Sequence, residues 1–410
     1  MRNCLIPLFC LPVFLILTAT GEINGEVETG GFLETGTYFD INRGAPEGNT
    51  YARLRWEAKT EISSNIFSLI SLDLRYYNFP GLEELSSVNE IESSYPLDLL
   101  LWEAYLEITQ FVWSNLDLKV GKQRIAWGTA DKFNPTDNLN PGDFLDLGGK
   151  LPTYALKADY YLGDYIITGV WLPYFEPVHL PRGGVKFLFG LVPDKVNLPD
   201  KTWQNSMFGL KLKGIAFNWD YSLSYFSGYD ELPVYFVENG KLEIGFPRME
   251  VIGFDFAGEI RSVGVWGEAG FFREKEESGS VPGFHEEQFL KYTLGMDYTF
   301  ENGIYAQAQY VHGFIMERGR DNLHDYLTGK VEKRLLNDEI TLSLSGILEA
   351  KEMGDIAGSY ATGFFPEITY RPVDNLQFIL GAFFLNGKRG TLLGDWKEFD
   401  QVYFKITVDF

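Results

Sequence analysis

The sequence predicts an all-β fold, a closed antiparallel transmembrane β-barrel of about 18 strands, with about 16 strands as the alternative. Three observations predict it. Segments of about ten residues alternate apolar and polar side chains, the connections between them alternate short and long, and the chain begins with an export signal. We expect short periplasmic turns and long extracellular loops, because an even number of strands leaves both termini on the periplasmic side.

The first residues have the organisation of a secretory signal peptide. Arg2 supplies a positive charge, an almost wholly apolar run extends from Cys4 to Leu17, and Thr18 to Gly21 are small residues. The run is shorter than the about 20 residues that a membrane-spanning helix needs. We therefore expect a cleaved signal peptide at residues 1–21 and an outer-membrane β-barrel at residues 22–410.

Composition excludes several other classes. Cys4 and Cys10 both lie inside the expected signal peptide, so the mature chain has no disulfide and no thiolate metal site. The chain has 35 basic side chains, one of them Arg2, against 57 acidic ones, which argues against binding to nucleic acid. No later stretch approaches about 18 consecutive apolar residues, so membrane-spanning helices are not expected.

The clearest alternating segment runs from Tyr51 to Ile62. Its even-numbered residues are mostly apolar, and its odd-numbered residues include Arg53, Arg55, Glu57 and Lys59. Successive side chains of a strand point to opposite faces of the sheet, so one face suits lipid and the other carries the charges. A strand of a soluble β-sandwich could also alternate, with its polar face in bulk water.

Other segments repeat this pattern, and the connections between segments can be placed approximately. The residues expected to face lipid include Leu100, Trp102, Ala104, Leu106 and Ile108; Phe217, Trp219, Tyr221, Leu223 and Tyr225; Leu290, Tyr292, Leu294, Met296 and Tyr298; and Ile340, Leu342 and Leu344. Short connections are expected near Ser63–Asn65, Phe111–Ser114, Leu162–Asp164, Gly214–Ile215, Ile260–Ser262, Glu301–Gly303, Leu336–Asp338 and Pro372–Asn375. The first strand, near Val27–Asn42, leaves no room for an N-terminal plug.

The last segment alternates up to the final residue. Its apolar face consists of Val402, Phe404, Ile406, Val408 and Phe410. A final strand that ends in Phe resembles the C-terminal assembly signal of bacterial outer-membrane proteins. The resemblance implies that the barrel assembly machinery recognises Phe404, Ile406, Val408 and Phe410, and that outer-membrane lipid and lipopolysaccharide surround the folded barrel.

A second resemblance covers Val120 to Asp143. The sequence there combines a Gly-Lys-Gln strand end, a Trp-Gly pair and Asn-Pro pairs. It resembles porin-like barrels of Gram-negative bacteria, a type that includes alginate-export and general porin barrels, and this implies an outer-membrane channel. The residues that carry the resemblance are Gly121, Lys122, Gln123, Trp127, Gly128, Asn134, Pro135, Asn140 and Pro141.

The loop that follows this strand end has two possible positions. Its length and polarity are compatible with folding into the lumen, where it would narrow the channel; alternatively it packs on itself at the surface, with Trp127 among the aromatic residues at the membrane interface. The residues expected to form a constriction are Gly121, Gln123, Trp127, Gly128, Asp131, Asn134, Pro135, Asp137, Asn140 and Pro141.

Inward-facing charges are the strongest functional indication. The residues expected to line the lumen are Arg53, Arg55, Glu57, Lys59, Asp73, Arg75, Glu103, Glu107, Asp117 and Lys119. Opposite charges on facing walls would give a transverse field that orients polar solutes. The alternative is that these side chains pair along the wall and only make it wettable.

Catalytic and metal chemistry have little support in the sequence. The four histidines, His179, His285, His312 and His324, show no zinc spacing, and no serine lies in a nucleophile-elbow motif. Asp137, Asp143 and Asp146 do not form an ordered calcium-ligand series. We expect no enzyme activity, no cofactor and no metal.

The favoured function is a porin-like channel for small hydrophilic solutes. One alternative is a dedicated channel for one ligand class, such as an anionic polysaccharide; another is a structural barrel with a closed lumen. The sequence leaves the solute and the oligomeric state open.

Overall fold

A computed structural model describes residues 26–42, 49–78, 97–143, 149–178, 193–275, 281, 286–314 and 316–410. The expected signal peptide, His179, His285 and Asp146 lie outside these residues. The described chain forms one 18-stranded antiparallel sheet, which closes because β1 pairs with β2 on one side and with β23 on the other. The predicted strand number is therefore confirmed, and the 16-strand alternative is wrong.

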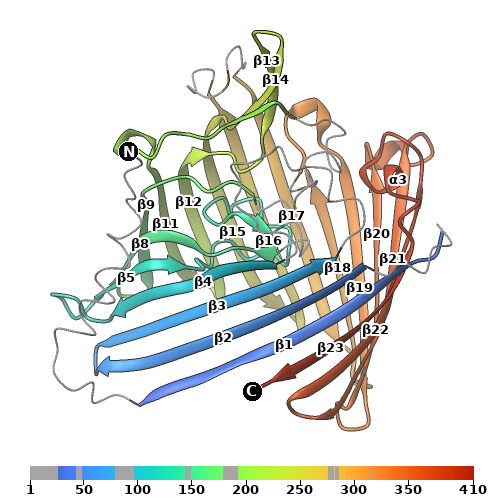
Figure 1. Cartoon of the computed structure of the whole chain (residues 1–410), viewed down its shortest axis with the longest axis horizontal. Helices are drawn as coiled ribbons and strands as arrows, with labels where there is room; N and C mark the ends of the chain where they lie inside the picture. The colour runs from blue at the N-terminus through green and yellow to red at the C-terminus, as the bar shows by residue number, and fades with distance from the viewer. Residues whose placement is uncertain are drawn as a thin grey trace.

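Each barrel strand pairs with the barrel strands next to it in the chain, so the sheet is a simple up-and-down barrel (Figure 1). Among the described residues, no helix has the length and apolar character that crossing a membrane requires. The barrel strands are β1 (Val27–Asp40), β2 (Asn49–Ser63), β3 (Ile66–Asn78), β4 (Leu97–Ile108), β5 (Leu116–Gln123), β8 (Thr153–Leu162), β9 (Tyr165–Leu172), β11 (Met207–Ala216), β12 (Trp219–Tyr229), β15 (Arg248–Ile260), β16 (Val263–Glu274), β17 (Gln288–Thr299), β18 (Ile304–His312), β19 (Asp325–Leu335), β20 (Ile340–Ala350), β21 (Tyr360–Val373), β22 (Leu376–Gly387) and β23 (Gln401–Asp409).

The alternation predicted from the sequence separates an outer from an inner face. Leu54 and Trp56 are exposed on the outside of β2, while Arg53 and Arg55 point inward and contact Asp73. An outer surface of apolar side chains suits lipid, and in a closed barrel every strand has two neighbours with which to pair its backbone groups.

Two residues of β4, Trp102 and Leu100, lie on the face opposite to the one predicted. The pairing of β3 with β4 shifts between Ser71 and Leu72, so that Trp102 is an extra residue in β4. Such a bulge re-aims the side chains that precede it. Trp102 consequently points into the lumen, where its ring lies 3.8 Å from the guanidinium carbon of Arg55. Leu100, also expected to face lipid, pairs with the inward-facing Asp73.

The short turn expected at Gly214–Ile215 lies instead at Phe217–Asn218. Both turn residues have positive φ values of 54° and 62°, as a tight hairpin turn requires. Phe217 is 95% exposed in this turn rather than being the first residue of a lipid-facing strand. Gly214 belongs to β11, where a Cβ would lie 2.6 Å from the ring of Tyr165, so this glycine makes room for a neighbouring ring.

The long connections contain further structure that the sequence did not predict. One small sheet combines β10 (Lys195–Asn197), β13 (Val234–Glu238) and β14 (Lys241–Gly245), and another pairs β6 (Gly142–Asp143) with β7 (Gly149–Lys150). The helical turns are η1 (Trp203–Asn205), η2 (Arg320–Asn322), η3 (Met353–Asp355) and α3 (Leu392–Asp395). In Figure 1, β13, β14 and α3 lie at the top of the barrel, away from the C-terminus.

The barrel interior contains an apolar core on one side. It combines inward-facing residues of β8 to β17 with residues of the long connections. Its members are Ile125, Trp127, Leu139, Ala155, Val170, Leu172, Phe175, Val196, Met207, Phe226, Tyr229, Ile244, Phe246, Met249, Val251, Phe272, Phe289 and Leu323. This core fixes the segment that follows β5 inside the barrel.

Candidate functional site

Residues 124–143, which we call the inward loop, leave β5 through two residues of the sequence motif. Gly121 has a φ of 127°, and a Cβ there would lie 2.2 Å from the carbonyl oxygen of Ala104, so only glycine fits. The fully buried Gln123 donates from Nε2 to the carbonyl oxygens of Lys119 at 3.1 Å and Ala155 at 3.0 Å. Together they fix the point at which the chain turns into the barrel.

The two ends of the inward loop are tied together by Asn140. Its Oδ1 accepts a hydrogen bond from the backbone N–H of Ile125 at 3.0 Å, and its Nδ2 donates to the carbonyl oxygen of Ile125 at 2.7 Å and to Asp137 at 2.8 Å. The other carboxylate oxygen of Asp137 accepts from Arg124 at 3.1 Å. Arg124 also donates from its backbone N–H to Glu103 on β4 at 2.8 Å.

Glu268 on β16 anchors the far side of the loop. Its carboxylate accepts hydrogen bonds from the backbone N–H groups of Thr129 at 2.7 Å, Ala130 at 2.9 Å and Thr136 at 2.9 Å, and from the Thr136 hydroxyl at 2.7 Å. A Cβ at Gly128, whose φ is 82°, would lie 2.5 Å from both carboxylate oxygens. Glycine is therefore required for the loop to approach Glu268 this closely.

Neighbouring strands add contacts to the same anchor. The Thr129 hydroxyl donates to Asp255 on β15 at 2.6 Å, Thr293 on β17 donates to the carbonyl oxygen of Phe133 at 2.9 Å, and Gln309 on β18 donates to that of Asp131 at 3.2 Å. The inward loop thus runs from β5 to β15–β18, which are five to eight strands away in the barrel order.

Four further motif residues lie within or at the end of this loop. Trp127 is 3% exposed in the interior core, with the ammonium of Lys211 5.4 Å from its ring, and so does not lie at the membrane interface. Asn134 donates to the carbonyl oxygen of Trp127 at 3.4 Å, and the carbonyl oxygen of Pro135 accepts from Asn138 at 3.1 Å. The carbonyl oxygen of Pro141 accepts from Leu151 at 2.7 Å.

Three arginines of β2 and β3 converge on one carboxylate. Arg53, Arg55 and Arg75 lie 2.8, 2.9 and 3.0 Å from the fully buried Asp73. Arg75 also contacts Asp143, the last residue of the inward loop, at 2.9 Å. We call Arg53, Arg55 and Arg75 the arginine cluster; the ring of Trp102 lies within 5.2 Å of all three guanidinium carbons.

The remaining predicted lumen residues mainly form local contacts. Lys119 pairs with Glu107 at 3.4 Å, Lys59 with Glu28 at 3.3 Å, and Glu57 accepts a hydrogen bond from Ser71 at 3.3 Å. Asp117 accepts from the backbone N–H of Gln110 at 2.8 Å, next to a turn. These side chains fit the expectation of pairing along the wall, whereas the arginine cluster joins strands and loop.

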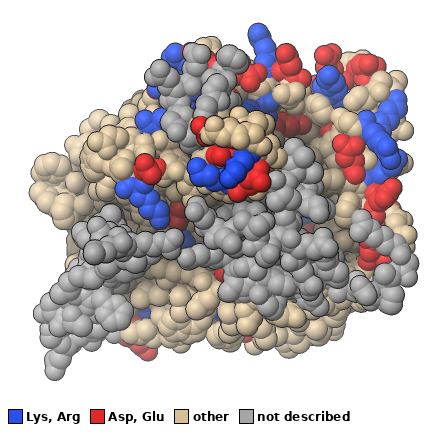
Figure 2. Space-filling model, turned by 45° about the horizontal axis from the view of Figure 1, so that its top comes forward, with Lys and Arg blue, Asp and Glu red and all other residues tan. Residues whose placement is uncertain are grey.

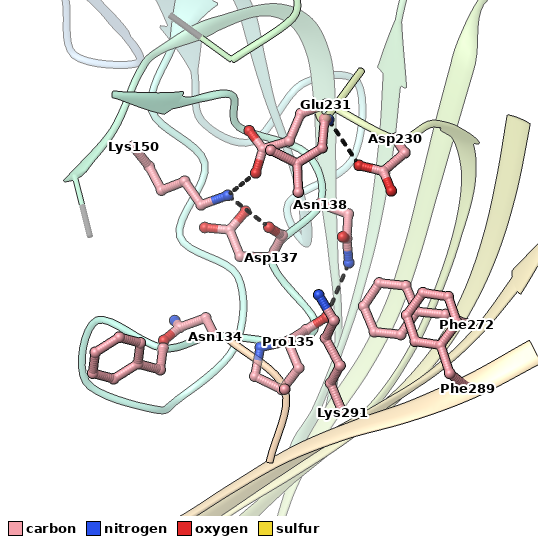
Figure 3. Close-up of a pocket in the computed structure, with 13 residues that line it drawn as sticks. Asn134, Pro135, Asp137, Asn138, Lys150, Asp230, Glu231, Phe272, Phe289 and Lys291 are labelled. Carbon is pink, nitrogen blue, oxygen red and sulfur yellow. Dashed lines mark hydrogen bonds and ion pairs between the residues drawn. The ribbon is translucent and has the colours of Figure 1, made fainter. Parts of the chain in front are cut away.

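A pocket that is partly open to solvent lies beside the inward loop (Figure 3). Its apolar side includes the stacked rings of Phe272 and Phe289, 5.0 Å apart, and Lys291 beside them donates to the carbonyl oxygen of Phe314 at 3.0 Å. Lys150 pairs with Glu231 at 2.9 Å on its polar side.

The charge of Lys150 follows from its neighbours. Burial alone would lower the pKa of Lys150, but the carboxylates of Glu231 and Asp137 overcome this effect and raise it, so the ammonium stays charged. Sequence reasoning missed Lys150, Glu231 and Glu268, because each contacts the inward loop only through the tertiary fold. It also missed Lys291, which lines the pocket beside the loop.

Two histidines contact carboxylates at the long-loop end. His312 contacts Asp325 at 2.8 Å, and His324 contacts Glu349 at 2.8 Å and Glu317 at 3.6 Å. Both oxygens of Glu349 also accept backbone N–H groups at the start of α3. The hydrogen bond to Glu349 raises the pKa of His324. The contacts of His324 and Glu349 join the loops above β19 and β20.

The outer surface shows how charge is distributed. In Figure 2, acidic and basic side chains gather toward the upper right, with smaller groups at the centre and the left, whereas the described residues visible along the lower edge are mostly uncharged. A low-charge flank between more polar ends is the pattern expected where strands meet lipid.

No protein-family model matches the sequence, and no curated protein is significantly similar to it. Solved structures are similar in fold. They include OccK9 (OpdG) of Pseudomonas aeruginosa, with a TM-score of 0.57, 11% identity, and coverage of 95% of this chain and 99% of that chain. The P. aeruginosa outer-membrane protein OpdK, solved with vanillate, has a TM-score of 0.57 and 9% identity over 94% of this chain and 98% of its own.

Acinetobacter baumannii OccAB2 gives a TM-score of 0.55 at 9% identity, covering 93% of this chain and 98% of that chain. At these identities the similarity concerns architecture. The chain therefore has the closed antiparallel barrel fold of these structures over almost its whole length.

Proposed function

We propose that this chain is a porin-like channel of the outer membrane, through which small hydrophilic solutes pass along a water-filled lumen. The observation that carries the proposal is the inward loop, which extends from β5 to Glu268 inside a closed 18-stranded barrel. A barrel of this size has an interior wider than its own wall side chains fill. The loop occupies one side and leaves the rest for solute.

The walls beyond the loop support an aqueous passage. On β19 and β20 most inward-facing residues are polar, among them Lys330, Glu332, Thr341 and Ser343, while their sequence neighbours Val331 and Leu342 are exposed on the outside. Alternation of this kind, apolar outside and polar inside, is what a water-filled transmembrane barrel requires.

The arginine cluster is proposed to set a preference among solutes. Arg53 and Arg55 keep 19% and 13% of their side-chain surface exposed while they share Asp73, so part of each cation still faces the interior. A small organic anion is the kind of solute that these groups would attract, and OpdK was solved with one, vanillate. The mixture of acids and bases gives less support to a channel dedicated to an anionic polysaccharide.

The remaining assignments belong to the same proposal. Residues 1–21 would direct export, the short turns would face the periplasm, and lipid and lipopolysaccharide would surround the barrel. The backbone of Phe410 exchanges two hydrogen bonds of 3.0 Å with Gly31 on β1, so the last residue takes part in closing the sheet. This supports recognition of the final strand by the barrel assembly machinery. The assignment is to a channel and not to an enzyme.

Fractionation and liposome swelling test the proposal. The mature protein should fractionate with the outer membrane and migrate differently on gels when unheated. Liposomes that contain it should swell in solutions of small sugars and swell less as solute size increases. A soluble periplasmic protein would contradict the proposal. A folded, membrane-embedded barrel that gives no swelling would favour the closed structural barrel.

A further inference from the structure

Three side chains of metal-ligating type meet at the long-loop end of the barrel. They are Glu317 in the connection between β18 and β19, His324 just before β19, and Glu349 near the end of β20. One ligand atom of each lies within 4.8 Å of the ligand atoms of the other two, and the described residues contain no second group of this kind. The Nδ1 atom of His324 lies 2.8 Å from Glu349 and 3.6 Å from Glu317.

The three groups are largely shielded from water. The side chain of Glu349 is 0% exposed, and those of Glu317 and His324 are 11% and 15% exposed. Two carboxylates therefore face one imidazole in a partly buried site, and a single imidazolium would neutralise only one of them. A buried charge is costly unless it is paired or coordinates a metal. A divalent cation in contact with all three groups would compensate both carboxylates at once.

Hydrogen bonds already hold both carboxylates in position. Glu317 accepts from the backbone N–H groups of Phe314 at 2.8 Å and His324 at 3.0 Å, and also from the Tyr326 hydroxyl. Glu349 accepts from two backbone N–H groups at the start of α3, at 2.7 and 2.8 Å. A carboxylate has about four lone-pair positions, so these bonds leave room for a further contact. Hydrogen bonds to the ligating groups are what orient the ligands of metal sites.

The chain neighbour of Glu317 is engaged on the other side of the same connection. Arg318 pairs with Asp230, which follows β12, at 2.5 Å, and with Glu274 on β16 at 2.7 Å. The connection between β18 and β19 thus directs its arginine toward β12 and β16 and its glutamate toward β20. A cation bound by Glu317 and Glu349 would strengthen the second of these attachments.

The donor set distinguishes among divalent cations. One imidazole nitrogen with two carboxylate oxygens suits zinc, whereas calcium and magnesium prefer sites made of oxygen alone. In tetrahedral zinc sites the bonds are about 2.0–2.2 Å long, which places the ligand atoms about 3.3 Å apart. The distances of 2.8 and 3.6 Å from His324 lie on either side of this value, so small side-chain adjustments suffice. Water would fill the fourth position.

We propose that Glu317, His324 and Glu349 form a zinc-binding site, which ties the connection between β18 and β19 to the end of β20. The ion takes the place of the hydrogen bond between His324 and Glu349, and protein kept in EDTA retains that hydrogen bond. Histidine spacing in the sequence does not indicate this site, because the ligands come together only when β19 pairs with β20. The site does not depend on the solute that passes through the barrel.

Zinc titration of the full mature protein tests the inference. The purified protein is freed of metal with EDTA, dialysed, and titrated with zinc chloride in a calorimeter. In Glu317→Gln and in His324→Gln, the zinc affinity should fall by more than about 100-fold, since loss of an outer hydrogen-bonding partner alone costs about 10–100-fold. Zinc should also raise the heat-modification temperature of the wild type, because it binds the folded barrel, and should raise that of the two variants less.

The matched control is His312→Gln. His312 lies at the same end of the barrel and contacts Asp325 at 2.8 Å, but it does not belong to the three-residue group. This control should keep the wild-type zinc affinity. X-ray absorption of the zinc-loaded wild type gives a measurement that does not depend on the folding of any variant. It should show a single imidazole nitrogen among otherwise oxygen ligands.

The outcomes separate this site from the channel function. A folded wild-type barrel that binds no zinc, or unchanged affinity in both ligand variants, would overturn the site and leave the channel standing. Two or more imidazoles on the bound zinc would also overturn it, because the ion would then lie at other histidines. A barrel that binds zinc at this site but conducts no current would instead contradict the proposed function.

Discussion

Glu268 is the residue at which the position of the inward loop can be tested most sharply. One of its carboxylate oxygens accepts from Thr129 and Ala130, and the other accepts from the backbone and hydroxyl of Thr136. In Glu268→Gln, the amide group replaces one oxygen. In the less costly orientation, the new NH2 group faces Thr136, and the Thr136 hydroxyl accepts a hydrogen bond from it. The backbone N–H of Thr136 then has no acceptor, which costs about 1–3 kcal/mol of loop anchoring.

Glu268→Ala removes all of these acceptors. Three backbone N–H groups then lose their partner, and lumen water that enters the space recovers part of the loss. We expect a net cost of about 3 kcal/mol, which shifts the balance between anchored and released loop about 100-fold. The glutamine variant should shift it about tenfold. The effects should therefore rise from wild type to glutamine to alanine.

Single-channel recording and hydrogen exchange measure this shift. A released loop should give larger and noisier current and faster amide exchange at residues 129–136. Deleting Thr129–Asp143 gives the upper limit of the conductance increase. The control is Glu259→Gln on neighbouring β15, because Glu259 accepts only from Ser262 at a turn in the described structure. Wild-type conductance and exchange in Glu268→Ala would refute the anchor.

Three further predictions concern charge, assembly and pH. Replacing Arg53, Arg55 and Lys59 together by glutamine should shift the reversal potential in a salt gradient toward cation preference, because Asp73 then keeps only Arg75; an unchanged potential would remove these side chains from the selectivity of the channel. Phe410→Asp should lower outer-membrane levels, since it introduces a charge next to the contact with Gly31, whereas Phe410→Leu should be tolerated; normal levels of the aspartate variant would count against an assembly role. The raised pKa of His324 adds stability that is complete below the unfolded-state value of about 6.5 and is lost as the pH rises through the folded-state value. The heat-modification temperature should fall over that range in the wild type, and a His324→Gln variant that shows the same fall would exclude this residue as the cause.

Local patterns predicted most of the barrel wall. Alternation has a period of two residues and needs no knowledge of neighbouring strands, so the faces of Tyr51–Ile62 could be predicted from the sequence. Trp102 shows where prediction from alternation fails. One inserted residue in β4 reverses the face, and only the pairing with β3 reveals the insertion.

Residues that act through distant partners could not be predicted. The motif from Gly121 to Pro141 is recognisable in the sequence, but the loop is held in place by Glu268, which lies 139 and 132 positions from its partners Thr129 and Thr136. Gly128 carries no local sign that it faces a carboxylate. The contact between the rings of Tyr38 and Tyr403 is similar, because these residues become neighbours only when the last strand closes on the first.

The central claim is that this barrel encloses a conducting lumen narrowed by the inward loop. Single-channel recording of the purified, heat-modifiable protein, with wild type and Glu268→Ala compared at the same salt concentration, tests it most directly. We predict steady conductance for the wild type and larger conductance for the variant. A folded wild-type barrel that carries no current, or equal conductance in the two proteins, would contradict the claim.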